Sequence, residues 1–169
     1  MRYITGIIAM GTECSLNTPG LWNIPKEVYL DEEVFKTVES DDSPFKDWGI
    51  ETNKLVKYRE FCLYNVANHV RAYVDMLYDG KFEELKDLFF EAINDSKSRK
   101  DIFMLVYGKL RHLAQFSKIN KFMEEEFGNA WLSYIDSVNT VAEHITKQAD
   151  DTEKLQEIQK IAEEMKIQV

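Results

Sequence analysis

Residues 64–77 read YNVANHVRAYVDML, and their spacing decides where the helical part of the chain begins. Apolar side chains recur at intervals of three and four, so the stretch is predicted to be an amphipathic helix. Its apolar face would hold Leu63, Val66, Ala67, Val70, Tyr73, Val74 and Leu77. Gly80 is the expected C-terminal cap, because glycine takes the left-handed conformation without strain.

Two asparagines and a histidine stand near the start of this predicted helix. Asn costs a helix interior roughly half a kcal/mol relative to Ala, because its amide competes for backbone partners. The face opposite the apolar one would carry Asn65, Asn68, His69, Ala72, Asp75 and Asp79. This face is either the solvated side of the helix, or a directional polar surface that contacts the N-terminal sheet or another protein. The residues expected to bind are Asn65, Asn68, His69, Arg71, Asp75 and Trp22.

The first fifty residues have a different character from the rest. They hold all three prolines and four of the seven glycines, with β-favouring runs at 3–8 and 28–30. Thr18-Pro19-Gly20 predicts a type II turn, since Pro fixes the first central φ and Gly supplies the second. Trp22 is predicted to be at least half buried, as a large anchor between this sheet and the helices.

Helical periodicity continues after residue 80, at 82–93, at 100–115, and from 117 or 118 to a break at Gly128-Asn129. The sequence therefore predicts an α+β fold, with a small N-terminal antiparallel sheet packed on a bundle of four to five helices. The expected divisions are a β-rich segment at 1–50, a bundle at 51–149 and an amphipathic helix at 150–169, all in one compact unit. The tail helix would present Leu155, Ile158, Ala162 and Met165. This seam is too short for a coiled coil, which favours packing on the core and a monomer over a homodimer.

Composition narrows the function classes. The 169 residues are 44% hydrophobic and 30% charged, with a formal net charge of −9. An acidic chain is a poor general nucleic-acid binder, but it suits a more basic protein partner. No apolar run reaches the length of a membrane span, so a cytoplasmic protein without membrane contact is expected. Cys14 and Cys62 lack metal-ligand spacing and are expected to be buried free thiols.

Motifs for catalysis or cofactor binding are absent from the sequence. It has no phosphate-binding glycine loop, dinucleotide fingerprint, serine elbow or zinc-ligand spacing, so no cofactor or metal is expected. His69, His112 and His144 fall on three different predicted helices. Cys14 could act as a nucleophile only with a base and an electropositive setting, and the sequence shows neither.

Four stretches together resemble a family of small bacterial proteins. They are MRYITG at 1–6, the pattern Cys14-x-Leu16-x-Thr18-x-Gly20-x-Trp22, YNVANHVRA at 64–72, and WLSYI at 131–135. The resemblance covers about residues 1–135 and implies a protein accessory to toxin–antitoxin or defence-type loci. Leu21 and Asn23 stand where that family has Asp and His, so chemistry carried by those two positions would be missing here.

Two function hypotheses follow. The first is a non-enzymatic interaction module, antitoxin-like or defence-associated, that binds a more basic partner protein. The alternative is a small hydrolase or nuclease, whose site would join the N-terminal turn to the Asn65/Asn68/His69 helix face.

Overall fold

The computed structural model describes residues 1–25, 27–28, 37–58, 60–142 and 144–145. The chain divides into two compact units, Met1–Phe127 and Gly128–Val169. The first unit contains the sheet and all the residues expected to bind. In the second unit, positions 129–142 are helical. The tail helix expected at 150–169, with its seam from Leu155 to Met165, lies outside the described residues.

The α+β fold class is confirmed, although the sheet is mixed. It has the order β2-β1-β4-β3. The strands are β1 (Arg2–Ile4), β2 (Thr37–Glu39), β3 (Ile50–Tyr58) and β4 (Glu60–Ala67). β1 runs antiparallel to β2 but parallel to β4, and β3 pairs antiparallel with β4. The predicted antiparallel arrangement therefore fails at the parallel β1–β4 pair, and the β-rich part extends beyond residue 50, because β3 and β4 supply half of the strands.

The stretch 64–77 is not one helix. It begins as the end of β4, passes through Asn68, and continues as α3 (His69–Tyr78). Leu63, placed on the helix face by the sequence pattern, is an exposed strand residue. The C-cap is Asp79, one position earlier than predicted, but Gly80 has the expected left-handed conformation: its φ is +74° and its N–H donates to the carbonyl of Leu77.

A short helix replaces most of the strand expected at 3–8. α1 (Gly6–Met10) follows β1 directly, and Ile8, Ala9 and Met10 are buried. Its isoleucine-rich sequence favours a strand, but packing of α1 against α3 overrides that local preference. Of the other expected strand, at 28–30, only residue 28 is described, and it is helical.

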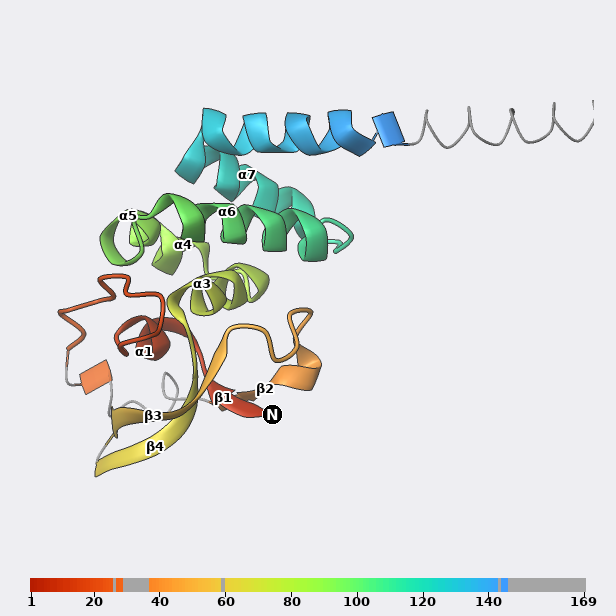
Figure 1. Cartoon of the computed structure of the whole chain (residues 1–169). Coiled ribbons are helices and arrows are strands. Elements are labelled where there is room, and N and C mark those ends of the chain that lie inside the picture. Colours follow the sequence, from red (N-terminus) through yellow and green to blue (C-terminus); the bar gives the residue numbers. More distant parts are fainter. Residues whose placement is uncertain (26, 29–36, 59, 143, 146–169) are drawn as a thin grey trace, which may run out of the picture. The chain divides into compact units, whose positions relative to one another are not determined.

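Helices α4 (Phe82–Leu85) and α5 (Leu88–Ala92) replace the single helix predicted at 82–93, because Asp87 has a φ of +61° and interrupts it. α6 (Ser96–Leu105) continues into a π-helical turn at Val106–Leu110, and α7 (Phe116–Phe127) ends at the predicted break. A short 3-10 turn, Ser40–Asp42, follows β2. Figure 1 shows α3 between the sheet and the layer formed by α4, α5 and α6.

Candidate functional site

The polar residues of the stretch 64–77 lie mostly in the interior. The exposed fractions are 8% for Asn68, 1% for His69, 0% for Arg71 and 5% for Asp75. Asn68, His69 and Asp75 of the predicted polar face therefore contact the rest of the chain rather than solvent, and Arg71, which is predicted to bind but not placed on that face, is buried with them. Asn65 differs, because it lies on β4 and its side-chain amide donates to the carbonyl of Arg2 at 2.9 Å.

Asn68 is the N-cap of α3. Its side-chain oxygen accepts the N–H of Arg71 at 2.8 Å, and its own N–H donates to the carbonyl of Gly49 at 2.7 Å. Asn is a preferred N-cap because it satisfies a backbone donor that the first helical turn leaves free. Gly49 has a φ of +72°, and a Cβ there would lie 2.8 Å from the Cβ of Arg71. The loop can approach α3 this closely only with glycine at position 49.

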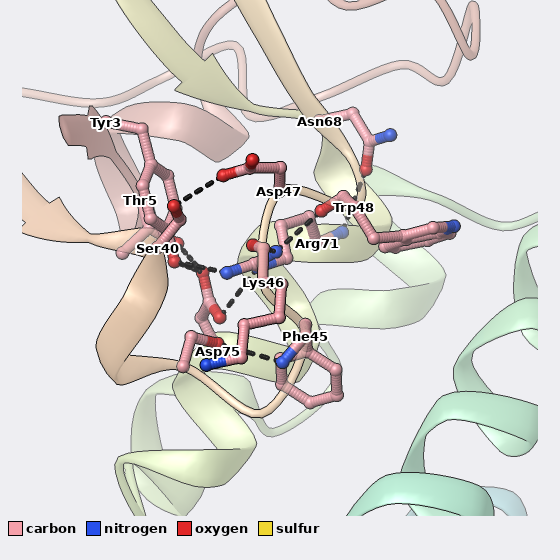
Figure 2. Close-up of polar contacts among 11 residues, drawn as sticks. Tyr3, Thr5, Ser40, Phe45, Lys46, Asp47, Trp48, Asn68, Arg71 and Asp75 are labelled. Atoms are coloured by element: carbon pink, nitrogen blue, oxygen red, sulfur yellow. Dashed lines mark hydrogen bonds and ion pairs between the residues drawn. The ribbon is translucent and has the colours of Figure 1, made fainter. Parts of the chain in front are cut away.

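A set of four side chains, three of them buried and Thr5 half-buried, ties β1 to α3 and is called the Arg71 cluster (Figure 2). It consists of Tyr3, Thr5, Arg71 and Asp75. The guanidinium Nε donates to the Asp75 carboxylate at 2.9 Å, and Nη2 donates to the Tyr3 hydroxyl at 2.6 Å. Nη1 donates to the carbonyls of Lys46 and Trp48, both at 2.6 Å. One arginine therefore joins a strand, a helix and the loop at 45–49.

Asp75 completes this network. Its second carboxylate oxygen accepts from the hydroxyls of Tyr3 and Thr5, each at 2.8 Å. Burial raises the pKa of Asp75, while the Arg71 charge and the two hydroxyls oppose that rise. Burial also raises the pKa of Tyr3, and the neighbouring Asp75 carboxylate adds to it. Since its groups are paired with one another, the Arg71 cluster acts chiefly as a structural junction.

Beside the cluster lies an acidic pocket of about 340 Å³. Four carboxylates line it, and no Lys or Arg is among the described residues that do so. The full lining is Tyr3, Thr5, Thr37, Val38, Glu39, Asp42, Ser43, Asp75, Tyr78 and Asp79. Burial raises the pKa of Asp79; Lys81 opposes this rise and Asp75 reinforces it. The pocket is thus suited to a cationic group.

A second constellation, the Cys14 relay, joins the N-terminal loop to the start of α3. It consists of Cys14, Thr18 and His69. The Cys14 sulfur lies 3.7 Å from the Thr18 hydroxyl, which lies 2.5 Å from Nδ1 of His69. Nε2 of His69 lies 2.9 Å from the carbonyl of Thr12. Since a carbonyl can only accept, Nε2 carries a proton, and in the tautomer with that proton alone Nδ1 is the acceptor.

His69 changes the acidity of the Cys14 thiol. Burial raises the pKa of Cys14, but hydrogen bonding and charge from His69 outweigh burial and lower it to about 7. The base that the sequence did not reveal is therefore present, on a helix far along the chain. Both residues stand in motifs that the sequence pattern singles out. The enzymatic alternative joins the N-terminal turn to the His69 face, but it does not predict the pairing of Cys14 with His69.

Gly20 allows the N-terminal loop to pack directly against His69 and α1. It has a φ of +69°, and a Cβ there would lie 2.8 Å from Cε1 of His69 and 2.9 Å from the carbonyl oxygen of Met10. The positive φ predicted for Gly20 is confirmed, but the type II turn at Thr18-Pro19-Gly20 is not formed, because Leu21 pairs with α1 instead of closing a turn onto Thr18. Leu21 then donates its N–H to the carbonyl of Met10, which fixes the chain on α1.

Two burial predictions are wrong. Trp22 is 85% exposed, because the close approach of Gly20 to His69 anchors the loop and leaves the indole outside the core. Cys62 is also exposed, on β4, whereas Cys14 is a buried free thiol as expected.

Comparisons with protein-family models, curated proteins and solved structures found no match. Within the described part of the chain, no group of three or more His, Cys, Asp or Glu side chains could hold a metal ion. None of the helices described is both long and apolar enough to cross a bilayer.

Proposed function

We propose that the protein is a non-enzymatic interaction module, antitoxin-like or defence-associated, that binds a more basic partner protein. The observation that carries the proposal is the acidic pocket at the carboxyl end of α3. The formal net charge of −9 supports the same partner chemistry, because opposite charge speeds encounter and selects partners. The resemblance to proteins of toxin–antitoxin and defence-type loci agrees with this role.

The carboxyl end of α3 carries acidic residues where helices usually favour basic ones. The last turn of a helix carries partial negative charge and favours cations by roughly 0.3–1 kcal/mol each. The last turn of α3 has no basic residue, and Asp75 and the C-cap residue Asp79 stand there instead. Arg71 neutralises Asp75, and Glu39 pairs with Arg2 and the N-terminal amine, whereas Asp42 and Asp79 form no ion pair within the described part of the chain. A cationic side chain from a partner would meet both carboxylates and the helix end.

The β3–β4 pair adds an apolar contact surface. Leu55 and Leu63 face each other across the two strands, and their exposed fractions are 59% and 65%. β3 is also an edge strand of the sheet. Adjacent exposed leucines on an edge pair suit a protein contact, since exposed apolar surface that gathers in one place marks interaction sites.

A charge-removing pair of substitutions tests the proposal. Asp42→Asn with Asp79→Asn keeps the shape of the pocket and removes two charges. The matched control is Glu124→Gln with Glu125→Gln, which removes two charges from α7. The immobilised wild-type chain should capture a basic protein in stoichiometric amounts from the native host. The pocket variant should lose that protein and the control should retain it; equal retention by both would refute the assignment of the pocket.

The same variant separates function from stability. Removing the Asp79 charge relieves repulsion at the negative end of α3, so the melting temperature should stay unchanged or rise slightly. A variant that loses its partner while remaining at least as stable has lost recognition rather than folding.

The enzymatic alternative has one observation in its favour. Cys14 and His69 meet at the junction where a hydrolase or nuclease site would lie, and thiol–imidazole pairs are a common form of activated nucleophile. Their burial opposes it, since Cys14 is 6% and His69 1% exposed, which leaves little access for an ester or a nucleotide. Turnover of such a substrate by the wild type, lost in Cys14→Ser, would favour the alternative.

A further inference from the structure

We propose that Cys14 is a modification site, at which the thiol reacts with hydrogen peroxide to give a sulfenic acid, assisted by Thr18 and His69. This inference is independent of the proposed partner binding, because it concerns the N-terminal loop and the start of α3 rather than the acidic pocket.

The geometry provides a proton path away from the sulfur. The thiol can donate to the Thr18 oxygen at 3.7 Å, and the Thr18 hydroxyl can donate to Nδ1 of His69 at 2.5 Å. The Thr12 carbonyl accepts from Nε2 at 2.9 Å, so the tautomer with its proton on Nε2 leaves Nδ1 to accept from Thr18. A nucleophile, a base and a group that orients the base are the components of an activated thiol.

Few other charges act on this thiol. The groups that act on its ionisation are His69 from α3 and the backbone of Leu16, and Thr18 contacts its sulfur. Two carboxylates, Glu13 and Glu51, stand in the same loop and on β3. Glu13 is an exposed neighbour in the loop. Glu51 of β3 accepts from the N–H and the hydroxyl of Ser15, at 2.9 and 2.7 Å. The imidazole is therefore the group that decides how readily Cys14 ionises.

The size of the reactant follows from burial. Cys14 is only 6% exposed and Gly20 packs against the imidazole, so a bulky electrophile would collide with the loop. Hydrogen peroxide is neutral and close to water in size, and it reacts with thiolates rather than thiols. Accessibility and chemistry therefore select the same class of reactant.

The step balances as follows. The Cys14 thiol proton passes through Thr18 to Nδ1 of His69, which leaves a thiolate. The thiolate sulfur attacks one peroxide oxygen, the S–O bond forms and the O–O bond breaks. The leaving hydroxide takes the proton back from the imidazolium and departs as water. Sulfur is oxidised by two electrons and peroxide is reduced; two equivalents of a thiol reductant return the sulfenic acid to the thiol with release of water.

The exposed Cys62 is the internal control for this reaction. Exposure alone predicts that Cys62 reacts first, whereas activation predicts Cys14. Relative to a thiol with the ordinary pKa of about 8.5, Cys14 holds about sixteen-fold more thiolate at pH 7, offset by about fivefold lower nucleophilicity, so it should react roughly threefold faster than such a thiol. The full chain is treated with hydrogen peroxide and dimedone, and labelling at each cysteine is followed by peptide mass spectrometry. Equal or faster labelling of Cys62 would overturn the proposal.

The pH dependence of Cys14 labelling identifies the assisting groups, measured in a Cys62→Ser background. The rate should rise with a midpoint near pH 7, the pKa of the assisted thiol. Thr18→Val should move that midpoint upward and Thr18→Ser should restore it. His69→Gln should move it above 8.5, the value of an unassisted thiol. A midpoint that Thr18→Val leaves unchanged would show that Cys14 reacts without the relay, even if His69→Gln fails to fold.

Discussion

Replacing Arg71 with Met should be among the most destabilising single changes in the first unit. The substitution keeps an apolar chain of similar length but leaves the Asp75 carboxylate buried without its counter-ion. Removing one partner of a buried pair costs about 3–5 kcal/mol. The carbonyls of Lys46 and Trp48 also lose a donor, although water can reach this part-buried side of the guanidinium. We therefore expect a loss of about 4 kcal/mol, a large fraction of the 5–15 kcal/mol typical of a folded domain.

Urea denaturation followed by circular dichroism measures this loss. With an m value of about 2 kcal/mol per molar, the midpoint should fall by about 2 M. Asp75→Asn alone should cost about 2 kcal/mol, since its hydroxyl donors retain an acceptor. The double variant should cost less than the sum of the two by at least about 1 kcal/mol, because the pair is coupled. A cost below about 1 kcal/mol for Arg71→Met, or strict additivity in the cycle, would refute the structural role of the cluster.

The pH dependence of the stability of Arg71→Met tests whether Arg71 holds down the pKa of Asp75. Burial already raises the pKa of Asp75, and removing Arg71 takes away the opposing charge, so the pKa of Asp75 should rise further. A raised folded-state pKa means that the folded chain binds the proton more readily than the unfolded chain. The cost of Arg71→Met should therefore be largest at neutral pH and should shrink as the pH falls toward 5.

Five further variants, in three comparisons, probe the loop and the helix cap by chemical denaturation. Asn68→Ala should cost about 1–2 kcal/mol because the N-cap is lost, whereas Asn65→Ala, at an exposed hydrogen bond, should cost less than about 0.5 kcal/mol. Gly20→Ala should cost more than about 2 kcal/mol of stability, through backbone strain and collision of the new Cβ with its neighbours. Gly6→Ala is the control and should cost only about 1 kcal/mol. Gly6 has a similar φ of +67°, but nothing lies within 4 Å of its Cβ. The stability of the wild type relative to Cys14→Ser should increase as the pH rises from 7 to 9, because the lowered pKa of Cys14 favours the folded thiolate there; a flat difference would contradict the lowered pKa.

Local sequence patterns predicted well where helices end and where glycine has a positive φ. The positive φ at Gly20 and Gly80 and the break at Gly128 follow from the strain that other residues meet in that conformation. The α+β class followed from the change of period along the chain. These features depend on neighbouring residues alone, which is why a sequence can reveal them.

The boundary within residues 64–77 was missed because two periods overlap there. Val66, Val70 and Val74 fit a helix, yet Val66 equally fits the alternation of a strand ending at Ala67. Asn68 carried the missing signal, since Asn placed just before an apolar periodic run is a typical N-cap. The same Asn that is costly inside a helix is favourable at the start of one.

The site itself could not be read from local sequence. Thr18 and His69 are 51 positions apart, and Tyr3 and Asp75 are 72 apart. Pairings at such separations come from the tertiary fold, which brings β1 and the N-terminal loop onto α3. The exposure of Trp22 was missed for a related reason: its size suggested an anchor, but a glycine that allows close approach to His69 serves that purpose.

The affinity of the captured basic protein for the wild type and for the Asp42→Asn/Asp79→Asn variant is the most direct test of the proposed function. Loss of two carboxylate contacts to a cationic side chain should weaken binding at least about tenfold, equivalent to about 1.4 kcal/mol. The affinity of the wild type should fall as salt is raised from 50 to 300 mM, and the variant should be less sensitive, because screening acts on the charges that it lacks. The Glu124→Gln/Glu125→Gln control should bind as the wild type does. Equal affinity and equal salt dependence for all three proteins would contradict the proposal that the acidic pocket recognises a basic partner.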